Sequence, residues 1–256
     1  MKEFFGFGGY TREPEGFLSW QHLTFVCSLL CIMAILAIWL GKRNRGNANK
    51  NRALIIAALL IDGFELIKIV LSCFRSGSAA SLLYDLPLFL CSIQLITIPL
   101  AAFSKGRIRE AALDFVCIFG LIGGVLGTVG AAQNYNSYPV LSMDNVISGI
   151  THCISGFSSL YILFAGMASM KRRNIGITFA LVLVFCAAAY IANITIPYNY
   201  MFLMSGDGTP YDILYNLVNG SKVFYPLLVV VLFLVCIVVY YSMFGFFRRK
   251  KATAQK

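Results

Sequence analysis

The sequence predicts an all-α membrane protein, a polytopic bundle of seven transmembrane helices that forms one domain over residues 1–256. Hydrophobic residues make up 59% of the chain and charged residues only 12%, whereas a soluble domain carries about 25% charged residues. Apolar runs of about 20 residues, long enough to cross ~30 Å of hydrocarbon, recur along the whole chain. These runs are continuous, whereas the strands of a membrane β-barrel would alternate polar and apolar residues.

The seven spans follow from these runs, and the longest connection between them has its own helix signals. Thr209, Pro210 and Asp212 are typical of a helix start, and Gly220 of a helix end. We therefore expect a short interfacial helix at 210–219 in the outer loop 197–221, serving either as a lid or as an aromatic anchor. The expected spans are 17–40, 52–74, 80–103, 111–132, 145–170, 175–196 and 222–247.

The net charge of +10 has a topological explanation. Most Lys and Arg residues fall after the first, third and fifth spans and in the C-terminal tail. An excess of basic residues marks the cytoplasmic side, so we expect a multi-pass cell-membrane protein with its N-terminus outside and its C-terminus cytoplasmic. This asymmetry leaves no charge that would need nucleic acid as a partner. The basic residues concerned are Lys42, Arg43, Arg45, Lys50, Arg52, Lys105, Arg107, Arg109, Lys171, Arg172, Arg173, Arg248, Arg249, Lys250, Lys251 and Lys256.

The eight cysteines indicate neither a disulfide framework nor a metal site. They lie within or at the edges of the apolar runs, and no two of them form a CxxC pair, the spacing that zinc sites use. We therefore expect no metal and no cofactor. The glycines between Gly120 and Gly130 have the spacing of close helix–helix packing.

Asp62, Glu65 and Lys68 lie inside the second apolar run. A charge near the middle of a bilayer costs a few kcal/mol or more, so such residues are usually paired or functional. Their three-residue spacing places them on a slowly rotating stripe of one helix. At 1.5 Å per residue, Asp62 falls near the midplane, and Glu65 and Lys68 fall in the outer half.

Other spans contribute polar groups at the same outer level. Buried polar groups in a membrane must be satisfied by each other or by water, and an outward-facing polar cavity would satisfy all of them. The alternative is that Glu65 and Lys68 pair within their own helix while the rest bond across helices. In the inner half we expect only an interfacial Asp114 and little else. The other polar residues at the outer level are His22, Asp85, Cys91, Gln133, Asn134, His152, Asn193, Asn199 and Tyr200.

Several short motifs recur here in a distinctive order: residues 18–23 (LSWQHL), Glu65, residues 86–93 (LPLFLCSI), His152 and residues 199–203 (NYMFL). Through them the chain resembles the YwaF-like family of bacterial integral membrane proteins, related to eukaryotic transmembrane protein 164. Residues 18–23 are similar to that family's entry into its first span, and residues 86–93 to its third-span signature. Glu65 and His152 match the family's membrane glutamate and fifth-span histidine, and residues 199–203 are similar to its loop motif.

The resemblance implies acyl transfer onto ether phospholipid for the eukaryotic relatives, attributed to a cysteine near this third-span signature. The corresponding proline-cysteine-histidine arrangement falls on Pro87, Leu88 and Phe89 here. Neither the nucleophile nor the base is present at those positions. Any such chemistry would have to use Cys91 and His152.

Three functions therefore compete. In a lipid acyltransferase or hydrolase, His152 would activate Cys91 or Thr151 as the nucleophile. Glu65 would orient the reacting groups or donate a proton to them. A transporter of a small polar solute or protons, or a non-catalytic receptor or partner subunit, would use the cavity for binding. We expect membrane lipid as a partner, and leave open a homo-oligomer or a partner membrane subunit. The expected binding residues are His22, Lys68, Asp85, Asn193, Asn199 and Tyr200.

Overall fold

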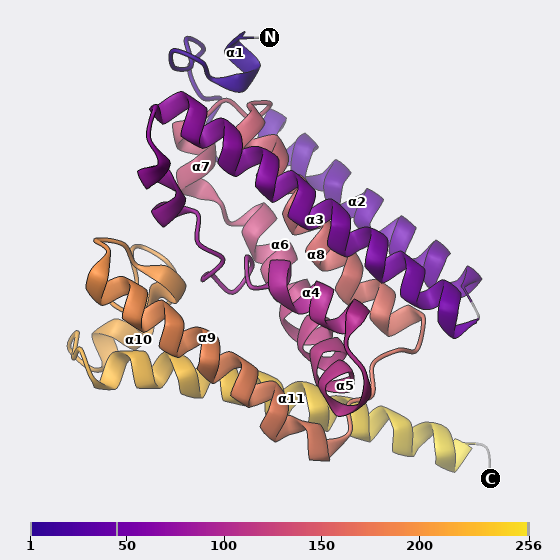
Figure 1. Cartoon of the computed structure of the whole chain (residues 1–256). Coiled ribbons are helices and arrows are strands. Elements are labelled where there is room, and N and C mark those ends of the chain that lie inside the picture. The colour runs from indigo at the N-terminus through magenta and orange to yellow at the C-terminus, as the bar shows by residue number, and fades with distance from the viewer. Residues whose placement is uncertain (1, 45, 255–256) are drawn as a thin grey trace.

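The computed structural model describes residues 2–44 and 46–254, and this part of the chain is helical without strands (Figure 1). Arg45 and Lys256, two of the basic residues that predict the topology, lie outside the described residues. The elements are α1 (Lys2–Phe5), α2 (Trp20–Arg43), α3 (Asn47–Ser76), η1 (Ala79–Tyr84), α4 (Gln94–Phe103), α5 (Gly106–Phe115), η2 (Val116–Gly120), α6 (Leu121–Val129), α7 (Ala132–Ser137), α8 (Met143–Phe164), η3 (Arg172–Asn174), α9 (Ile175–Thr195), η4 (Tyr200–Phe202), α10 (Asp212–Leu217) and α11 (Phe224–Ala254).

Within the described residues, five helical segments are long and apolar enough to cross a membrane. They match five of the seven expected spans. The 30-residue α3 is also long enough, but Asp62, Glu65 and Lys68 interrupt its apolar sequence. The five segments are Trp20–Arg43, Gly106–Ser137, Met143–Phe164, Arg172–Thr195 and Phe224–Phe246.

The expected span at 80–103 is not one continuous helix. A 3₁₀ helix ends at Tyr84, residues 85–93 are irregular, and only residues 94–103 form α4. Pro87 explains the interruption, because proline lacks an amide donor and disfavours helical backbone at the residue before it. Beyond it, the Phe89 amide donates to the Ser92 hydroxyl, at 3.0 Å. The irregular segment places Asp85, Phe89 and Cys91 where a regular helix could not present all three together.

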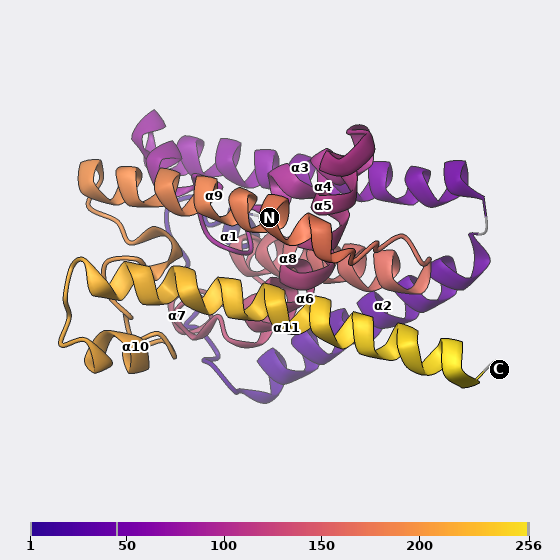
Figure 2. The ribbon, with the colours of Figure 1, turned by 90° about the horizontal axis from the view of Figure 1, so that it is seen from below.

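Helix α8 is the central element of the bundle. It packs against α2, α3 and α6, and α6 continues from α5 through η2. Helices α9 and α11 form a separate pair that joins the bundle along α5 and η2 (Figures 1 and 2). The N-terminal segment and the C-terminus lie at opposite ends of the molecule (Figure 1).

The junction of α5 and α6 is a π-helical turn, Val116–Gly120. Two carbonyl groups of this turn accept hydrogen bonds from α8. The Ser159 hydroxyl donates to the Cys117 carbonyl at 2.6 Å, and the Ser155 hydroxyl donates to the Gly120 carbonyl at 3.1 Å. A Cβ on Gly124 would lie 2.8 Å from the Gly156 backbone. The expected close packing at these glycines is therefore present.

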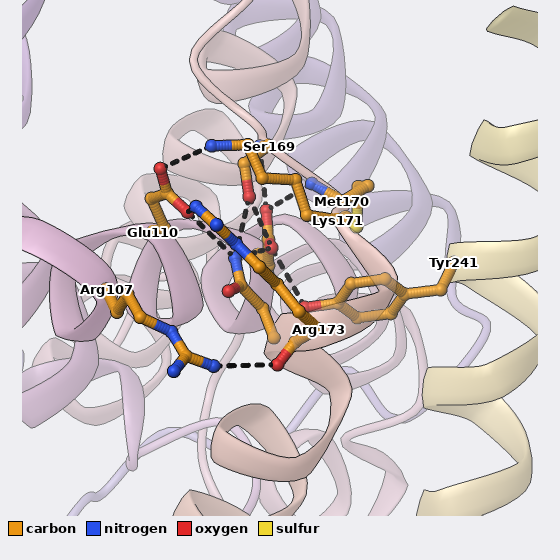
Figure 3. A network of polar contacts seen from close by, with 9 residues as sticks. Arg107, Glu110, Ser169, Met170, Lys171, Arg173 and Tyr241 are labelled. Carbon is orange, nitrogen blue, oxygen red and sulfur yellow. Dashed lines mark hydrogen bonds and ion pairs between the residues drawn. The ribbon is translucent and has the colours of Figure 1, made fainter.

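A polar network surrounds Asp114 on the side of the basic loops (Figure 3). Asp114 is fully buried. Its carboxylate accepts hydrogen bonds from the Ser169 and Met170 amides at 2.8 and 2.9 Å, and from the Ser169 and Tyr241 hydroxyls at 2.9 Å. Met170 itself has left-handed backbone, with φ 42°. The expectation that the inner half offers little besides Asp114 is wrong, because polar partners from the α8–α9 loop and α11 tie this carboxylate to both elements.

The short helix of the outer loop is confirmed as α10, somewhat shorter than expected. The Thr209 hydroxyl accepts a hydrogen bond from the Tyr211 amide at 3.3 Å. Gly220 ends the segment with φ 66°, and its amide donates to the Tyr215 carbonyl at 2.9 Å. Left-handed glycine with this bond is a usual way to end a helix.

Candidate functional site

A cavity of about 570 Å³ lies between α3, the irregular segment after η1, α7 and α8. Five of the nine expected site residues line it, and Gln133 and Asn134 line it as well. Its wall is about equally polar and apolar, so it offers hydrogen-bonding groups beside hydrocarbon. The five site residues are Glu65, Lys68, Asp85, Cys91 and His152.

Lys68 carries the central charge of this cavity. Its ammonium lies 2.5 Å from a Glu65 carboxylate oxygen and 3.3 Å from an Asp85 oxygen. Glu65 is buried. Its contact with Lys68 is the pair within one helix that the sequence predicts as an alternative. Asp85 reaches Lys68 from the irregular segment after η1, so the pair extends into a bridge between two chain segments.

A second ion pair at the cavity was not expected from the sequence. The Arg75 guanidinium donates two hydrogen bonds to the Asp144 carboxylate, both 2.6 Å long. The Tyr10 hydroxyl donates to the same carboxylate at 2.5 Å. Arg75 lies in the last turn of α3 and Asp144 in the first turn of α8, so the pair joins two helices with the N-terminal segment. One sequence signal was available, because Arg75 is a basic residue on the side that the charge distribution leaves poor in basic residues.

Cys91 and His152 meet the same face of α6. A Cβ on Gly123 would lie 3.2 Å from the Cys91 Cα, and a Cβ on Gly127 would lie 2.4 Å from the His152 Cε1. Positions four apart on a helix lie about 6 Å from each other on one face. Because Gly123 and Gly127 have no side chains, Cys91 and the His152 ring can each approach α6 closely at neighbouring positions on one face. Within the described part of the chain, no hydrogen bond engages the His152 ring nitrogens.

Phe89, which replaces the histidine of the resembling signature, belongs to an aromatic cluster at the cavity. Its ring centroid lies 5.9 Å from Tyr198, 5.3 Å from Tyr200 and 5.7 Å from Phe202. The cluster joins the segment after η1 to the outer loop. Phe89 therefore packs the cavity wall and supplies no base.

Four of the expected binding residues lie outside this cavity. His22 is buried between the rings of Phe17 and Tyr135, and its Nδ1 accepts from the Leu18 amide at 3.1 Å. Its ring therefore packs against the N-terminal segment and does not line the cavity. Asp62, which is not one of these four, is exposed on α3 and does not line the cavity.

The other three expected binding residues outside the cavity, Asn193, Asn199 and Tyr200, form hydrogen bonds within and beside the outer loop. The Asn193 side chain exchanges two hydrogen bonds with the Tyr200 backbone, at 2.7 and 3.0 Å. The Asn199 amide nitrogen donates to the Ser205 carbonyl and to the Asp207 carboxylate. The Tyr200 hydroxyl donates to the Leu83 carbonyl. These residues fasten the loop beside the cavity without lining it.

The cavity wall is net acidic. Three carboxylates, those of Glu65, Asp85 and Asp144, face two cations, Lys68 and Arg75. Two tyrosines beside these carboxylates have raised pKa values: Tyr198, which lines the cavity, and Tyr10, which bonds to Asp144. Burial, reinforced by Asp85, raises the pKa of Tyr198. Burial and the hydrogen bond to Asp144 raise the pKa of Tyr10 to about 12, so its hydroxyl stays protonated and donating at neutral pH.

No set of metal ligands stands out in the part of the chain that the structure describes. A search there for three or more His, Cys, Asp or Glu side chains that could hold a metal ion finds none. The charged side chains of the cavity, those of Glu65, Lys68, Asp85, Arg75 and Asp144, are instead paired with one another.

Comparison with known proteins gives one match. The model of the TMEM164 family matches residues 17–243. This range includes every residue that lines the cavity, and all of the helices that surround it. No match to the chain is found among curated proteins or among solved structures. The expected relation to transmembrane protein 164 is confirmed.

Proposed function

The chain belongs to the TMEM164 family, and we propose that it is a lipid-modifying membrane enzyme that catalyses acyl transfer or hydrolysis. One observation carries the proposal. Cys91 and His152 line one cavity and rest on adjacent glycines of α6. A thiol beside an imidazole is the basic equipment of nucleophilic acyl chemistry.

In the proposed topology the chain crosses the cell membrane seven times, with α3 as the second crossing and residues 79–103 as the third. The N-terminus lies outside and the C-terminus in the cytoplasm. Five long apolar helices and the two termini at opposite ends support an odd number of crossings. The charges of Glu65 and Lys68 are acceptable in a membrane because these two side chains neutralise each other.

The proposed reaction begins with attack of the Cys91 sulfur on the carbonyl carbon of a lipid ester. His152 takes the thiol proton and returns it to the leaving alcohol as the carbon–oxygen bond breaks. A thioester then links the acyl group to Cys91. Water, or a hydroxyl of a second lipid, attacks the thioester, His152 accepts its proton, and the proton passes to the released thiolate. Bonds and protons balance over the cycle.

The charged residues have supporting roles in this reaction. Lys68 stabilises the negative charge that develops on the carbonyl oxygen, as a fixed cation in a site of low dielectric constant does. Glu65 and Asp85 hold its ammonium from two chain segments. Thr151 is a weaker nucleophile candidate than Cys91, because its hydroxyl donates to the Ser148 carbonyl at 3.0 Å.

The test uses the full-length protein in phosphatidylcholine nanodiscs that contain a lipid with a radiolabelled acyl chain. We expect a label on the wild-type protein that hydroxylamine removes, which identifies a thioester. Cys91→Ser should abolish this label, and His152→Gln should slow its formation at least ~100-fold, since general base catalysis contributes about 10²–10⁴-fold.

Cys153→Ser is the matched control, because Cys153 adjoins His152 in sequence but lines a different groove and donates to the Leu29 carbonyl. This variant should label like the wild type. Equal labelling of Cys91→Ser and the wild type would overturn the proposal. Solute or proton flux into liposomes that Glu65→Gln stops, without any acyl label, would favour a transporter.

A further inference from the structure

A second cavity of about 570 Å³ lies near the basic loops, remote from Cys91 and His152. It is formed by the start of α3, the turn between α4 and α5, and the segment after α8. None of its lining residues takes part in the proposed reaction. They are Asn47, Lys50, Asn51, Ala102, Phe103, Ser104, Lys105, Arg109, Leu113, Gly166 and Met167.

The charges of this cavity are all positive. Lys50, Lys105 and Arg109 line it, and no carboxylate does. Acidic residues are available nearby, but they are engaged elsewhere, since Glu110 pairs with Lys171 at 2.6 Å. Among the described residues, none of the three cavity cations takes part in an ion pair.

Arg109 is held in place by neutral groups. Its Nε donates to the Ala101 carbonyl at 3.2 Å, and one Nη donates to the Asn51 side-chain oxygen at 2.9 Å. The Asn51 amide nitrogen in turn donates to the Ala102 carbonyl at 2.9 Å. A basic residue that only sets topology needs no fixed position. Arg109 is instead oriented while its charge is left without a counter-ion.

Uncharged hydrogen-bond donors also lie at this second cavity. The Ser104 hydroxyl oxygen is buried without a hydrogen-bond partner among the described residues. Helix α5 begins at Gly106, next to Lys105, and the first amides of a helix have no partner within it. These amides, with the helix dipole, favour an anion at this end.

We propose that this cavity binds a phosphate group, either from an anionic phospholipid of the adjacent leaflet or from a soluble phosphate ester. Arg109 would contact two phosphate oxygens through its planar guanidinium, whereas Lys50 and Lys105 would act as point charges. Ser104 would supply its hydroxyl as a donor. Carboxylates line the first cavity and are missing from this one, so the two cavities select ligands of different charge.

The experiment measures binding to the full-length protein in phosphatidylcholine nanodiscs, with thermal unfolding as the readout. One arm adds phosphatidic acid to the nanodiscs, and the other adds inorganic phosphate or glycerol 3-phosphate to the buffer. We expect saturable stabilisation in one arm. Lys50→Gln/Lys105→Gln should weaken it by roughly tenfold or more, because two charge-assisted contacts are lost.

The control, Lys42→Gln/Arg172→Gln, removes the same charge from exposed positions on the same side and leaves the cavity intact. It should weaken binding less than ~threefold, as expected for screened surface charges. Saturation by phosphatidic acid alone would identify a lipid ligand, and saturation by the soluble compounds alone a phosphate ester. An equal loss in both double variants, or no saturation in either arm, would overturn the proposal.

Discussion

The Asp114 network and the cavity around Lys68 are both polar sites in an apolar bundle, but they differ in what remains unbonded. Asp114 is fully buried, and five donors surround its two oxygens. Around Lys68 the carboxylates are paired, yet His152 and Cys91 face open volume. A closed, satisfied network stabilises a structure. A cavity with unused reactive groups is suited to a ligand.

The largest expected effect is on stability, at Asp114. Asp114→Ala leaves the Ser169 and Met170 amides buried without an acceptor, and we expect it to lower the free energy of unfolding by about 3 kcal/mol or more. Asp114→Asn keeps one carbonyl oxygen and should cost less. Thermal unfolding in detergent, with Glu110→Gln as a nearly neutral control, checks this order. An Asp114→Ala variant as stable as the wild type would show that the network is dispensable.

The second prediction compares two glycines of α6, Gly127 beside the His152 side chain and Gly124 beside the Gly156 backbone. Gly127→Ala places a Cβ against the flexible His152 ring, so it should displace the imidazole and reduce acyl labelling roughly 100-fold, as misplaced catalytic groups do. Gly124→Ala places its Cβ against the Gly156 backbone and should mainly lower stability. Labelling and unfolding are measured on both variants. Equal losses of labelling at equal stability would contradict the assignment.

The third effect is at the Arg75–Asp144 pair, which lies at the cavity but is fully bonded. Arg75→Gln leaves Asp144 with only the Tyr10 hydroxyl, and should lower stability by about 1–2 kcal/mol. A double-mutant cycle with Asp144→Asn measures the coupling between the two residues. If the two changes were simply additive, the pair would not join α3 to α8 energetically.

The smallest effect depends on pH and concerns the N-terminal segment. Burial raises the pKa of Glu15, but the 2.8 Å hydrogen bond from the Val140 amide, the bond from its own amide and the charge of Arg12 together outweigh it, so the pKa lies below the ordinary 4.5. A carboxylate with a lowered pKa stabilises the fold above pH 4.5, and this contribution disappears as the pH falls through the lowered value. Hydrogen exchange of residues 6–19 should increase in that range for the wild type, whereas Glu15→Gln should exchange faster at neutral pH without this pH dependence. Identical profiles would exclude Glu15 as the anchor.

The sequence could predict which polar residues of different spans lie near one another better than it could predict where each side chain points. The positions of Glu65, Lys68 and His152 along their apolar runs predict one common level, and these residues do share a cavity. His22 was expected at the same level, but its ring turns towards Tyr135, and nothing in a run of apolar neighbours specifies that rotation.

Contacts between distant segments were also beyond sequence reasoning. Arg75 and Asp144 are 69 residues apart, and their pairing depends on how α3 and α8 cross. The interruption at 85–93 was only partly predictable, because Pro87 weakens a helix without fixing the path that replaces it. The network around Asp114 was not foreseen because its partners come from a loop and from α11, which the local sequence does not reveal.

The π-helical turn between α5 and α6 also determines which face of α6 each following residue occupies. It holds one residue more than an α-helical turn, and each residue rotates a helix by about 100°. Removal of a single residue from Val116–Gly120 would therefore turn Gly123 and Gly127 away from Cys91 and His152, with every side chain of the cavity unchanged. The contacts of Cys91 and His152 with α6 thus depend on the number of residues in a distant turn as much as on their own identity.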